Sequence, residues 1–251
     1  MSIRRAMVLL IGFGVIAGVL LLVVFLPNRS PIIKTNADFF LEDIFFFGDR
    51  TADALREDGR IIAALVPHHL IAGTELATIF KLLQSKEYTR VFLIGPNHYD
   101  AGQANILTAT LHVETPFGRE TMNRWIPYPE IAPELLAHEH SIMGMMPYVS
   151  YYLNADTQPF ILKAKTSPQE IGALAESIAA VMDEKTILIF SIDFSHYLPK
   201  DVAEKNDRVT AQALLAMDED LVYDMSNDYV DSPPSLALMF QICLQQHARF
   251  K

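Results

Sequence analysis

Residues 187–196 read Ile187-Leu188-Ile189-Phe190-Ser191-Ile192-Asp193-Phe194-Ser195-His196. The first six residues are apolar apart from one serine, and the run stops at Asp193. A short apolar run of this kind, rich in β-branched residues and bounded by a polar breaker, is typical of a strand buried on both faces of a parallel sheet. This stretch therefore predicts a central strand that ends at a group of polar side chains.

Two earlier stretches have the same form. Residues 61–66 form an apolar run that a proline ends, and residues 91–94 form one that a glycine and a proline end. Helical patterns occur over residues 71–83 and 167–182, and the second begins with Ser-Pro-Gln-Glu, a typical helix start. Alternating strands and helices predict a protein of the α/β class, with a central, mostly parallel sheet flanked by helices.

Each of the three predicted strands is followed by residues that can carry chemistry. These residues are His68 and His69 after the first strand, His98 after the second, and Asp193 and His196 after the third. In open parallel sheets, ligands bind in the crevice beyond the carboxyl ends of the strands. One such histidine alone would be an ordinary hydrogen-bonded loop residue. Three strands that deliver such side chains to one edge predict a shared site.

The chemistry of this group suits a divalent transition metal. Neutral imidazole binds iron, zinc, copper and manganese, and two histidines with one carboxylate leave open positions on a non-haem iron. The same groups also suit metal-free acid–base chemistry, because histidine titrates near neutral pH and an aspartate can orient it. The run His138-Glu139-His140 adds polar groups whose direction the sequence leaves open.

The composition limits the class of protein. The chain has 251 residues, with 30 Asp and Glu against 20 Lys and Arg, and a formal net charge of -10. This acidic balance argues against nucleic acid as the partner, because phosphate contacts need basic side chains. The single cysteine, Cys243, excludes an intramolecular disulfide framework and a zinc site built from several cysteines. We expect it to be a core thiol on the last helix.

Residues 1–27 are predicted to be a membrane anchor. The 21 residues from Ala6 to Leu26 contain no charged side chain, and a helix of that length crosses the hydrocarbon layer of about 30 Å. A cleaved signal peptide is the alternative, but the run is longer than such peptides need and has no Ala-x-Ala site. Arg4 and Arg5 favour a cytoplasmic N-terminus. We therefore expect a single-pass membrane protein whose globular domain lies outside the cytoplasm.

Five motifs occur in order along the predicted α/β domain, which we place at residues 61–251, after a linker and a phenylalanine-rich segment at 28–60. They are Val66-Pro67-His68, Gly95-Pro96-Asn97-His98, Thr115-Pro116-Phe117-Gly118, Glu139-His140-Ser141-Ile142 and Ser191-Ile192-Asp193-Phe194-Ser195-His196. Together they resemble the Memo family, also called AmmeMemoRadiSam system protein B, from Ile61 to Leu244. The resemblance implies the fold that this family shares with LigB-type class III extradiol dioxygenases, with a metal-capable pocket at the strand ends.

The resemblance also implies roles for individual residues. The family's first two pocket histidines fall on His68 and His98. Its third candidate ligand, a cysteine, is matched by Asp231, and a carboxylate there would favour Fe(II), Mn(II) or Zn(II) over Cu(I). The acid–base or supporting groups of the pocket would be His140, Asp193 and His196. The implied cofactor is a divalent transition metal, with iron favoured and copper, zinc or manganese as alternatives.

Several alternatives stay open at this level. His69 could take the place of His68, and Asp231 could serve only as the N-cap of the helix that begins near Pro233. Two functions fit the site. One is a membrane-anchored, Memo-like metal-binding protein that acts as a metal-dependent oxidoreductase, and the other is a non-catalytic module that binds a small molecule or a peptide in the same cleft. Whether the protein is an enzyme is therefore left open.

Overall fold

The computed structural model describes residues 31–34 and 59–249. The predicted membrane anchor at residues 1–27 and the phenylalanines at residues 39–47 lie outside the described residues. Within the described ranges, no helix combines the length and the apolar character that a membrane span requires.

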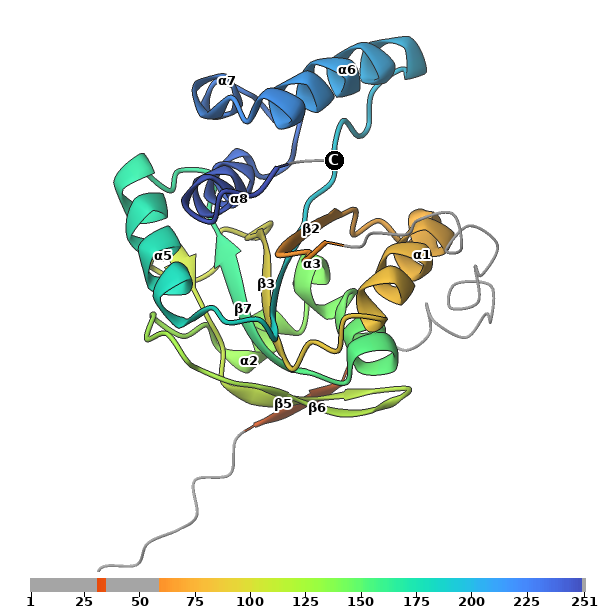
Figure 1. Cartoon of the computed structure of the whole chain (residues 1–251), viewed down its shortest axis with the longest axis vertical. Coiled ribbons are helices and arrows are strands. Elements are labelled where there is room, and N and C mark those ends of the chain that lie inside the picture. The colour runs from red at the N-terminus through yellow and green to blue at the C-terminus, as the bar shows by residue number, and fades with distance from the viewer. Residues whose placement is uncertain (1–30, 35–58, 250–251) are drawn as a thin grey trace, which may run out of the picture. The chain divides into compact units, whose positions relative to one another are not determined.

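The described residues form a sheet of eight strands at the centre of the domain (Figure 1). The strands are β1 (Ile32–Lys34), β2 (Ala63–Val66), β3 (Arg90–Pro96), β4 (Ile106–Leu107), β5 (Leu111–Thr115), β6 (Gly118–Met122), β7 (Asp156–Leu162) and β8 (Thr186–Ser191). Their order is β1-β5-β6-β7-β3-β8-β2, and β4 pairs with β7 beside this path. Pairs along the path are parallel except for the β5–β6 hairpin, and β4 is antiparallel to β7. The predicted mostly parallel sheet is confirmed.

Helices cover both faces of this sheet (Figure 1). α1 (Gly73–Gln84) packs on one face, and α5 (Pro168–Val181) and α8 (Pro233–Gln245) pack on the other. The shorter elements are η4 (Leu70–Ala72), α2 (Pro133–Leu136), α3 (His140–Met143), α4 (Met146–Tyr148) and η5 (Val149–Leu153), and two further helices, α6 (Lys200–Ala216) and α7 (Glu219–Tyr223), precede α8. The helices predicted at 71–83 and 167–182 are both present, and the second begins with a capping box.

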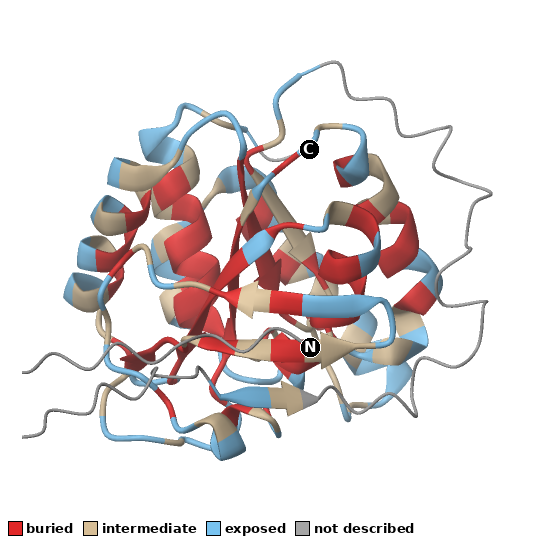
Figure 2. Cartoon of the chain, turned by 90° about the horizontal axis from the view of Figure 1, so that it is seen from below, coloured by how far each residue is buried: buried red, intermediate tan, exposed pale blue. Residues whose placement is uncertain are grey.

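The central strands are buried on both faces, as their apolar sequences predict. Val91 and Leu93 of β3 belong to the core that includes α1, whereas Phe92 and Ile94 belong to the core that includes α5 and α8. β8 alternates between the two cores in the same way. Figure 2 shows the buried residues concentrated in the sheet and on the helices beside it. Because successive side chains of a strand point to opposite faces, each central strand supports both cores.

Several elements have no counterpart in the sequence prediction, among them β7, the β5–β6 hairpin and the helices α6 and α7. Pro159 lies in the middle of β7, and proline is normally excluded from central strands because it cannot donate to the ladder. The strand tolerates it here because β6 pairs with β7 only at Thr157 and β4 pairs with β7 only at Ile161 and Leu162. Pro159 falls between these pairings, where its carbonyl accepts a hydrogen bond from the Thr108 hydroxyl.

The strand order brings three chemically interesting strand ends together. β2, β8 and β3 are neighbours and run parallel, so their carboxyl ends lie at the same edge of the sheet. α3 comes close to this edge because residue 95 is glycine: a Cβ there would lie 2.7 Å from Ser141 Oγ. The Ser141 hydroxyl instead shares its one hydrogen between the Pro96 carbonyl at 3.1 Å and Glu139 Oε1 at 2.8 Å. These contacts fix the first turn of α3, which begins with His140.

Candidate metal centre

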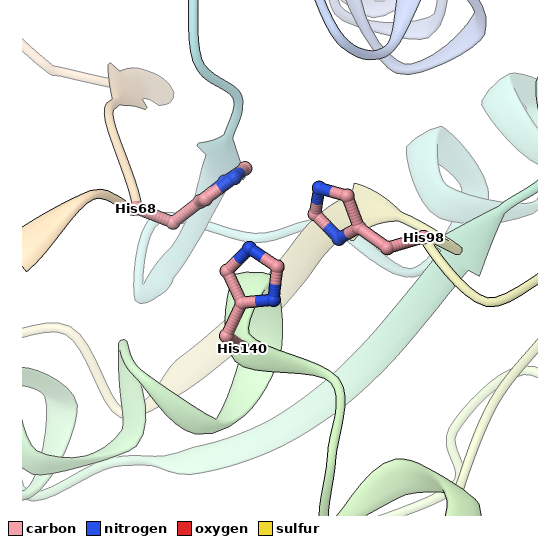
Figure 3. Close-up of side chains that lie close together, drawn as sticks. All are labelled: His68, His98 and His140. Atoms are coloured by element: carbon pink, nitrogen blue, oxygen red, sulfur yellow. The ribbon is translucent and has the colours of Figure 1, made fainter. Parts of the chain in front are cut away.

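Five side chains from five separate segments meet at this edge. His68, His98 and Asp193 each follow a strand by two residues, His140 opens α3, and Asp231 precedes α8. Figure 3 shows the three imidazole rings turned toward one another. Ligand atoms of two overlapping groups, His68-His98-His140 and His68-Asp193-Asp231, lie within 4.8 Å of one another and could hold a metal ion. The structure therefore brings together the residues that the sequence places at the site, except His196 and the alternative His69.

His68 is held so that its Nε2 atom faces carboxylates. Its Nδ1 lies 3.3 Å from the carbonyl oxygen of Ser191, which can only accept, so the contact favours a hydrogen on Nδ1. Nε2 lies 3.1 Å from Asp231 Oδ2 and 3.5 Å from Asp193 Oδ2. His69 is exposed, so His68 is the inward member of the pair.

His98 is oriented by a buried glutamate. Glu139 Oε1 lies 2.7 Å from His98 Nδ1, and Glu139 Oε2 accepts the backbone N–H of His98 at 2.9 Å. Glu139 is itself held by the hydroxyl of Ser141 at 2.8 Å and by its backbone N–H, because it forms the N-cap of α3. A carboxylate on Nδ1 leaves Nε2 as the atom available to a metal, and Nε2 lies 3.6 Å from Asp231 Oδ2.

Asp231 is the buried carboxylate at the centre of this group. Its side chain is only 4% exposed, yet neither carboxylate oxygen has a hydrogen-bond partner of acceptable geometry. Buried charged groups are normally paired and hydrogen-bonded, because an uncompensated one is costly. The alternative role as a helix cap is wrong, because Ser232 occupies the N-cap position of α8. Two imidazole nitrogens facing an orphaned carboxylate are an arrangement that a cation would complete.

The electrostatics of the metal-free centre agree with this description. Burial acts to lower the pKa of His98, but the nearby Asp231 and Glu139 carboxylates outweigh it and raise the pKa to about 9. Burial acts to raise the pKa of Asp231, yet the contacts with His68 and His98 hold it below its ordinary value. The pKa of Glu139 is lowered in the same way, by His98 and Ser141, against the effect of burial. Without a metal, a proton on His98 therefore balances part of the negative charge.

The centre is open to solvent on the side of His140. The His140 side chain is 53% exposed, and its ring stacks on His98 at 4.2 Å between centroids. Burial and the neighbouring His98 and His68 lower the pKa of His140, so its ring is neutral at pH 7. A neutral, accessible imidazole beside His68 and His98 can accept a proton or bind the ion itself.

Asp193 and His196 differ in their placement. Asp193 Oδ1 accepts the backbone N–H groups of His68 at 2.9 Å and His69 at 3.4 Å, so this carboxylate holds the loop that carries His68. His196 belongs to neither group of candidate ligands. Its Nδ1 lies 3.0 Å from the Phe194 carbonyl in its own loop. The acid–base role of His196 stays a prediction.

Two separations between donor atoms can be compared with those around one ion. Ligand atoms about 2.0–2.2 Å from a metal lie roughly 3.0–3.5 Å from one another in tetrahedral or octahedral geometry. Asp231 Oδ2 is 3.1 Å from His68 Nε2 and 3.6 Å from His98 Nε2. Two imidazoles and a carboxylate suit a divalent transition metal in their chemistry, and His68 is the residue that the two groups of candidate ligands share.

Replacing Glu139 by glutamine is expected to weaken metal binding by about 10–100-fold, the usual effect of removing a carboxylate behind a histidine ligand. The amide keeps the shape but loses the charge that fixes the His98 tautomer and raises its pKa. Calorimetric titration of the metal-free variant with Zn²⁺ measures the change. Glu134→Gln, at an exposed position five residues earlier, is the matched control, and equal affinities for the two variants would contradict this role.

Comparison with known proteins agrees with the motifs. A family model described as Memo-like protein matches residues 40–232, a range that contains all five side chains of the centre. The chain belongs to the family of Memo-like proteins. A MEMO1 family protein of Pyrobaculum aerophilum is 25% identical over 185 residues, which are 68% of this chain and 66% of that protein.

Two other similar proteins are also named as MEMO1 family proteins. The protein of Methanococcoides burtonii is 29% identical over 176 residues, which are 65% of each chain. The protein of Methanopyrus kandleri is 28% identical over 176 residues, which are 62% of this chain and 60% of that protein. The chain thus matches 60–66% of the length of these Memo-like relatives.

Two residues of the Memo-like site have no role in the sequence analysis. Glu139 stands between two histidines, and nothing in that spacing shows that its carboxylate turns toward His98, 41 residues earlier. Ser191 reads as part of an apolar strand, yet its carbonyl orients His68. The one available signal is that Glu139 is an acidic residue directly before a short helix, where it caps the first turn.

Proposed function

We propose that this Memo-like protein binds one divalent transition-metal ion between His68, His98 and Asp231. The observation that carries the proposal is the Asp231 carboxylate, buried and without hydrogen bonds, with two imidazole Nε2 atoms 3.1 and 3.6 Å from its Oδ2. Glu139 and the Ser191 carbonyl hold the far side of the two rings, as supporting groups do around histidine ligands.

The donor set favours iron among the candidate metals. Two histidines and one carboxylate on one side of an ion are typical of non-haem Fe(II), and they also suit Mn(II) and Zn(II). Soft Cu(I) prefers thiolate, and the family's cysteine is matched here by Asp231. A bound iron would supply redox chemistry and open positions for a ligand.

The other residues of the centre support an oxidoreductase reaction on a small-molecule or peptide ligand. The neutral His140 ring lies on the open side, where it can accept a proton from an incoming ligand. Asp193 holds the His68 loop through two backbone N–H groups, which keeps the donor set in place during such a step. Catalysis in this protein is a proposal that rests on the site and not on the fold.

Metal selectivity tests the proposed donor set. The full-length protein, stripped of metal, is titrated anaerobically with Fe²⁺ and separately with Cu⁺ under chelator competition. We expect one equivalent of Fe²⁺ to bind, and we expect Asp231→Cys to gain Cu⁺ affinity and lose Fe²⁺ affinity, because a thiolate is the softer ligand. A wild-type protein that binds neither ion would favour the alternative of a non-catalytic module for a small molecule or peptide. Unchanged selectivity in Asp231→Cys would remove Asp231 from the ligand set.

We also propose that residues 1–27 anchor the protein in a membrane, with the Memo-like domain outside the cytoplasm. The support is the charge-free run from Ala6 to Leu26 behind Arg4 and Arg5. Alkaline extraction of membranes should leave the full-length protein in the pellet and release a variant that lacks residues 1–27. Protease added to intact cells or spheroplasts should digest the domain, and its protection there would contradict the proposed orientation.

A further inference from the structure

A buried lysine lies beneath the loop that carries His98. Lys163 directly follows β7, and its side chain is only 4% exposed. Its Nζ donates to the carbonyl oxygens of Asp100 at 2.9 Å and Gly102 at 2.7 Å, and it lies 3.0 Å from Asp100 Oδ1. An ammonium group has three donors, so all three are used on a single loop.

Hydrogen bonds, and not apolar packing, hold the rest of this loop. Residues 98–100 and 102–103 are exposed, so apolar packing does little to hold them. Asp100 and Gly102 both have positive φ angles, 48° and 70°, and their carbonyls meet at Nζ. The Asn97 side chain closes the remaining turn through two hydrogen bonds of 2.9 Å to the backbone of Ala101.

The lysine is itself fixed to the sheet. The carbonyl of Leu162, the residue before it, accepts the backbone N–H of Asn97 at 2.8 Å, where β7 and β3 end side by side. Lys163 donates its own backbone N–H to Asn105, and its carbonyl accepts from Thr166. The Lys163 backbone is thus fixed at the end of the sheet, and its side chain contacts three oxygen atoms of the loop. This one residue therefore connects the loop to the sheet.

We propose that Lys163 is a positioning residue for the metal centre, which holds the loop of residues 97–102 so that His98 meets Asp231. This inference rests on the proposed metal binding. Glu139 contacts both the ring and the backbone N–H of His98, and Lys163 holds the carbonyls of Asp100 and Gly102 further along the same loop. A buried ammonium is costly unless its donors are satisfied, so an apolar side chain would pack here at least as well if anchoring the loop were unnecessary.

The test compares Lys163→Met with Lys165→Met in the full-length protein. Lys165 is an exposed lysine two residues further along the same segment, so its variant controls for the loss of a positive charge. We expect Lys163→Met to bind Zn²⁺ about tenfold or more weakly than wild type, the effect of a lost supporting contact. Lys165→Met should bind it as wild type does. Electron paramagnetic resonance of the Cu²⁺-loaded proteins should count one imidazole nitrogen fewer in Lys163→Met, the same count as in His98→Ala.

A crystal structure of metal-free Lys163→Met separates this inference from the proposed function. We expect the 97–102 loop to have moved and the 2.7 Å contact between His98 Nδ1 and Glu139 to be lost. If wild type binds no metal, the proposed function fails, and the position of His98 in this structure still decides the role of Lys163. An unmoved loop, or an unchanged affinity and nitrogen count, would overturn the inference. Lys163→Gln, which keeps a polar group but cannot reach three acceptors, replaces Lys163→Met if that variant does not fold.

Discussion

Asp231→Asn is expected to lower the affinity for Fe²⁺ or Zn²⁺ by roughly 100-fold or more, because the loss of a supporting carboxylate alone costs about 10–100-fold. Asparagine keeps the shape of the side chain but removes the charge that faces both His68 and His98. The metal-free variant should stay folded, because asparagine keeps the size of the side chain and the backbone N–H of residue 231 keeps its hydrogen bond to the Asp193 carbonyl at 3.1 Å. Chelator-competition titration measures the affinity, and circular dichroism verifies the fold.

The matched control for this variant is Asp228→Asn. Asp228 lies three residues earlier in the same loop and is exposed, and its contacts are made by its backbone. The Asp228→Asn variant should therefore bind metal with the affinity of wild type. Equal losses in the two variants would point to a general effect on the loop, and no loss in Asp231→Asn would place the ion elsewhere.

Metal affinity should rise with pH by about 100-fold between pH 7 and pH 9. The pKa of His98 in the metal-free protein is raised to about 9, so below that pH its ring carries a proton. A metal binds the neutral ring, so each ion that enters releases about one proton and the apparent affinity changes about tenfold per pH unit. Above pH 9 the proton is already lost, and the affinity should level off.

The pH range of this rise distinguishes the centre from a site of unperturbed histidines. An ordinary imidazole, with a pKa of about 6.5, would give an affinity that is almost flat above pH 7. Glu139→Gln removes one of the groups that raise the pKa of His98, so its profile should level off at a lower pH than that of wild type. A wild-type affinity that does not change between pH 7 and pH 9 would contradict the pairing of His98 with Asp231 and Glu139.

The sheet could be predicted from the sequence where burial is complete. The runs around Phe92 and Phe190 are apolar on both faces, so their pattern alone indicates central parallel strands. β7 could not be predicted, because Pro159 argues against a central strand, and only the gap between β6 and β4 makes it acceptable. The strand order could not be predicted either. β8 lies between β2 and β3 in the sheet although it comes much later in the chain.

The candidate site could be predicted as far as the strand ends define it. His68, His98 and Asp193 follow neighbouring parallel strands, so their meeting at one edge follows from the fold class. Asp231 follows no strand of the sheet, and the resemblance to the Memo family is what indicated it. The supporting groups Glu139 and Lys163 could not be found, because hydrogen bonds across 41 and 61 residues leave no trace in local spacing.

His140 has two possible roles at the site. The sequence assigns it to acid–base chemistry through the family, and the structure places its ring 4.2 Å from that of His98 and 4.9 Å from that of His68. At that range it can be a ligand of the ion or a proton acceptor beside it. Electron paramagnetic resonance of Cu²⁺-loaded His140→Ala distinguishes the two roles. If His140 is a ligand, the variant should show one imidazole nitrogen fewer than wild type, and if it is only a proton acceptor, the number should not change.

The metal content of the full-length protein, purified without a histidine tag, tests the central claim most directly. Elemental analysis should find close to one equivalent of a divalent transition metal in wild type, with iron dominant. The His68→Ala, His98→Ala double variant should contain almost none, because both imidazole donors of the proposed set are gone. A folded wild-type protein that holds no metal at pH 8, or a double variant that keeps its metal, would contradict the claim.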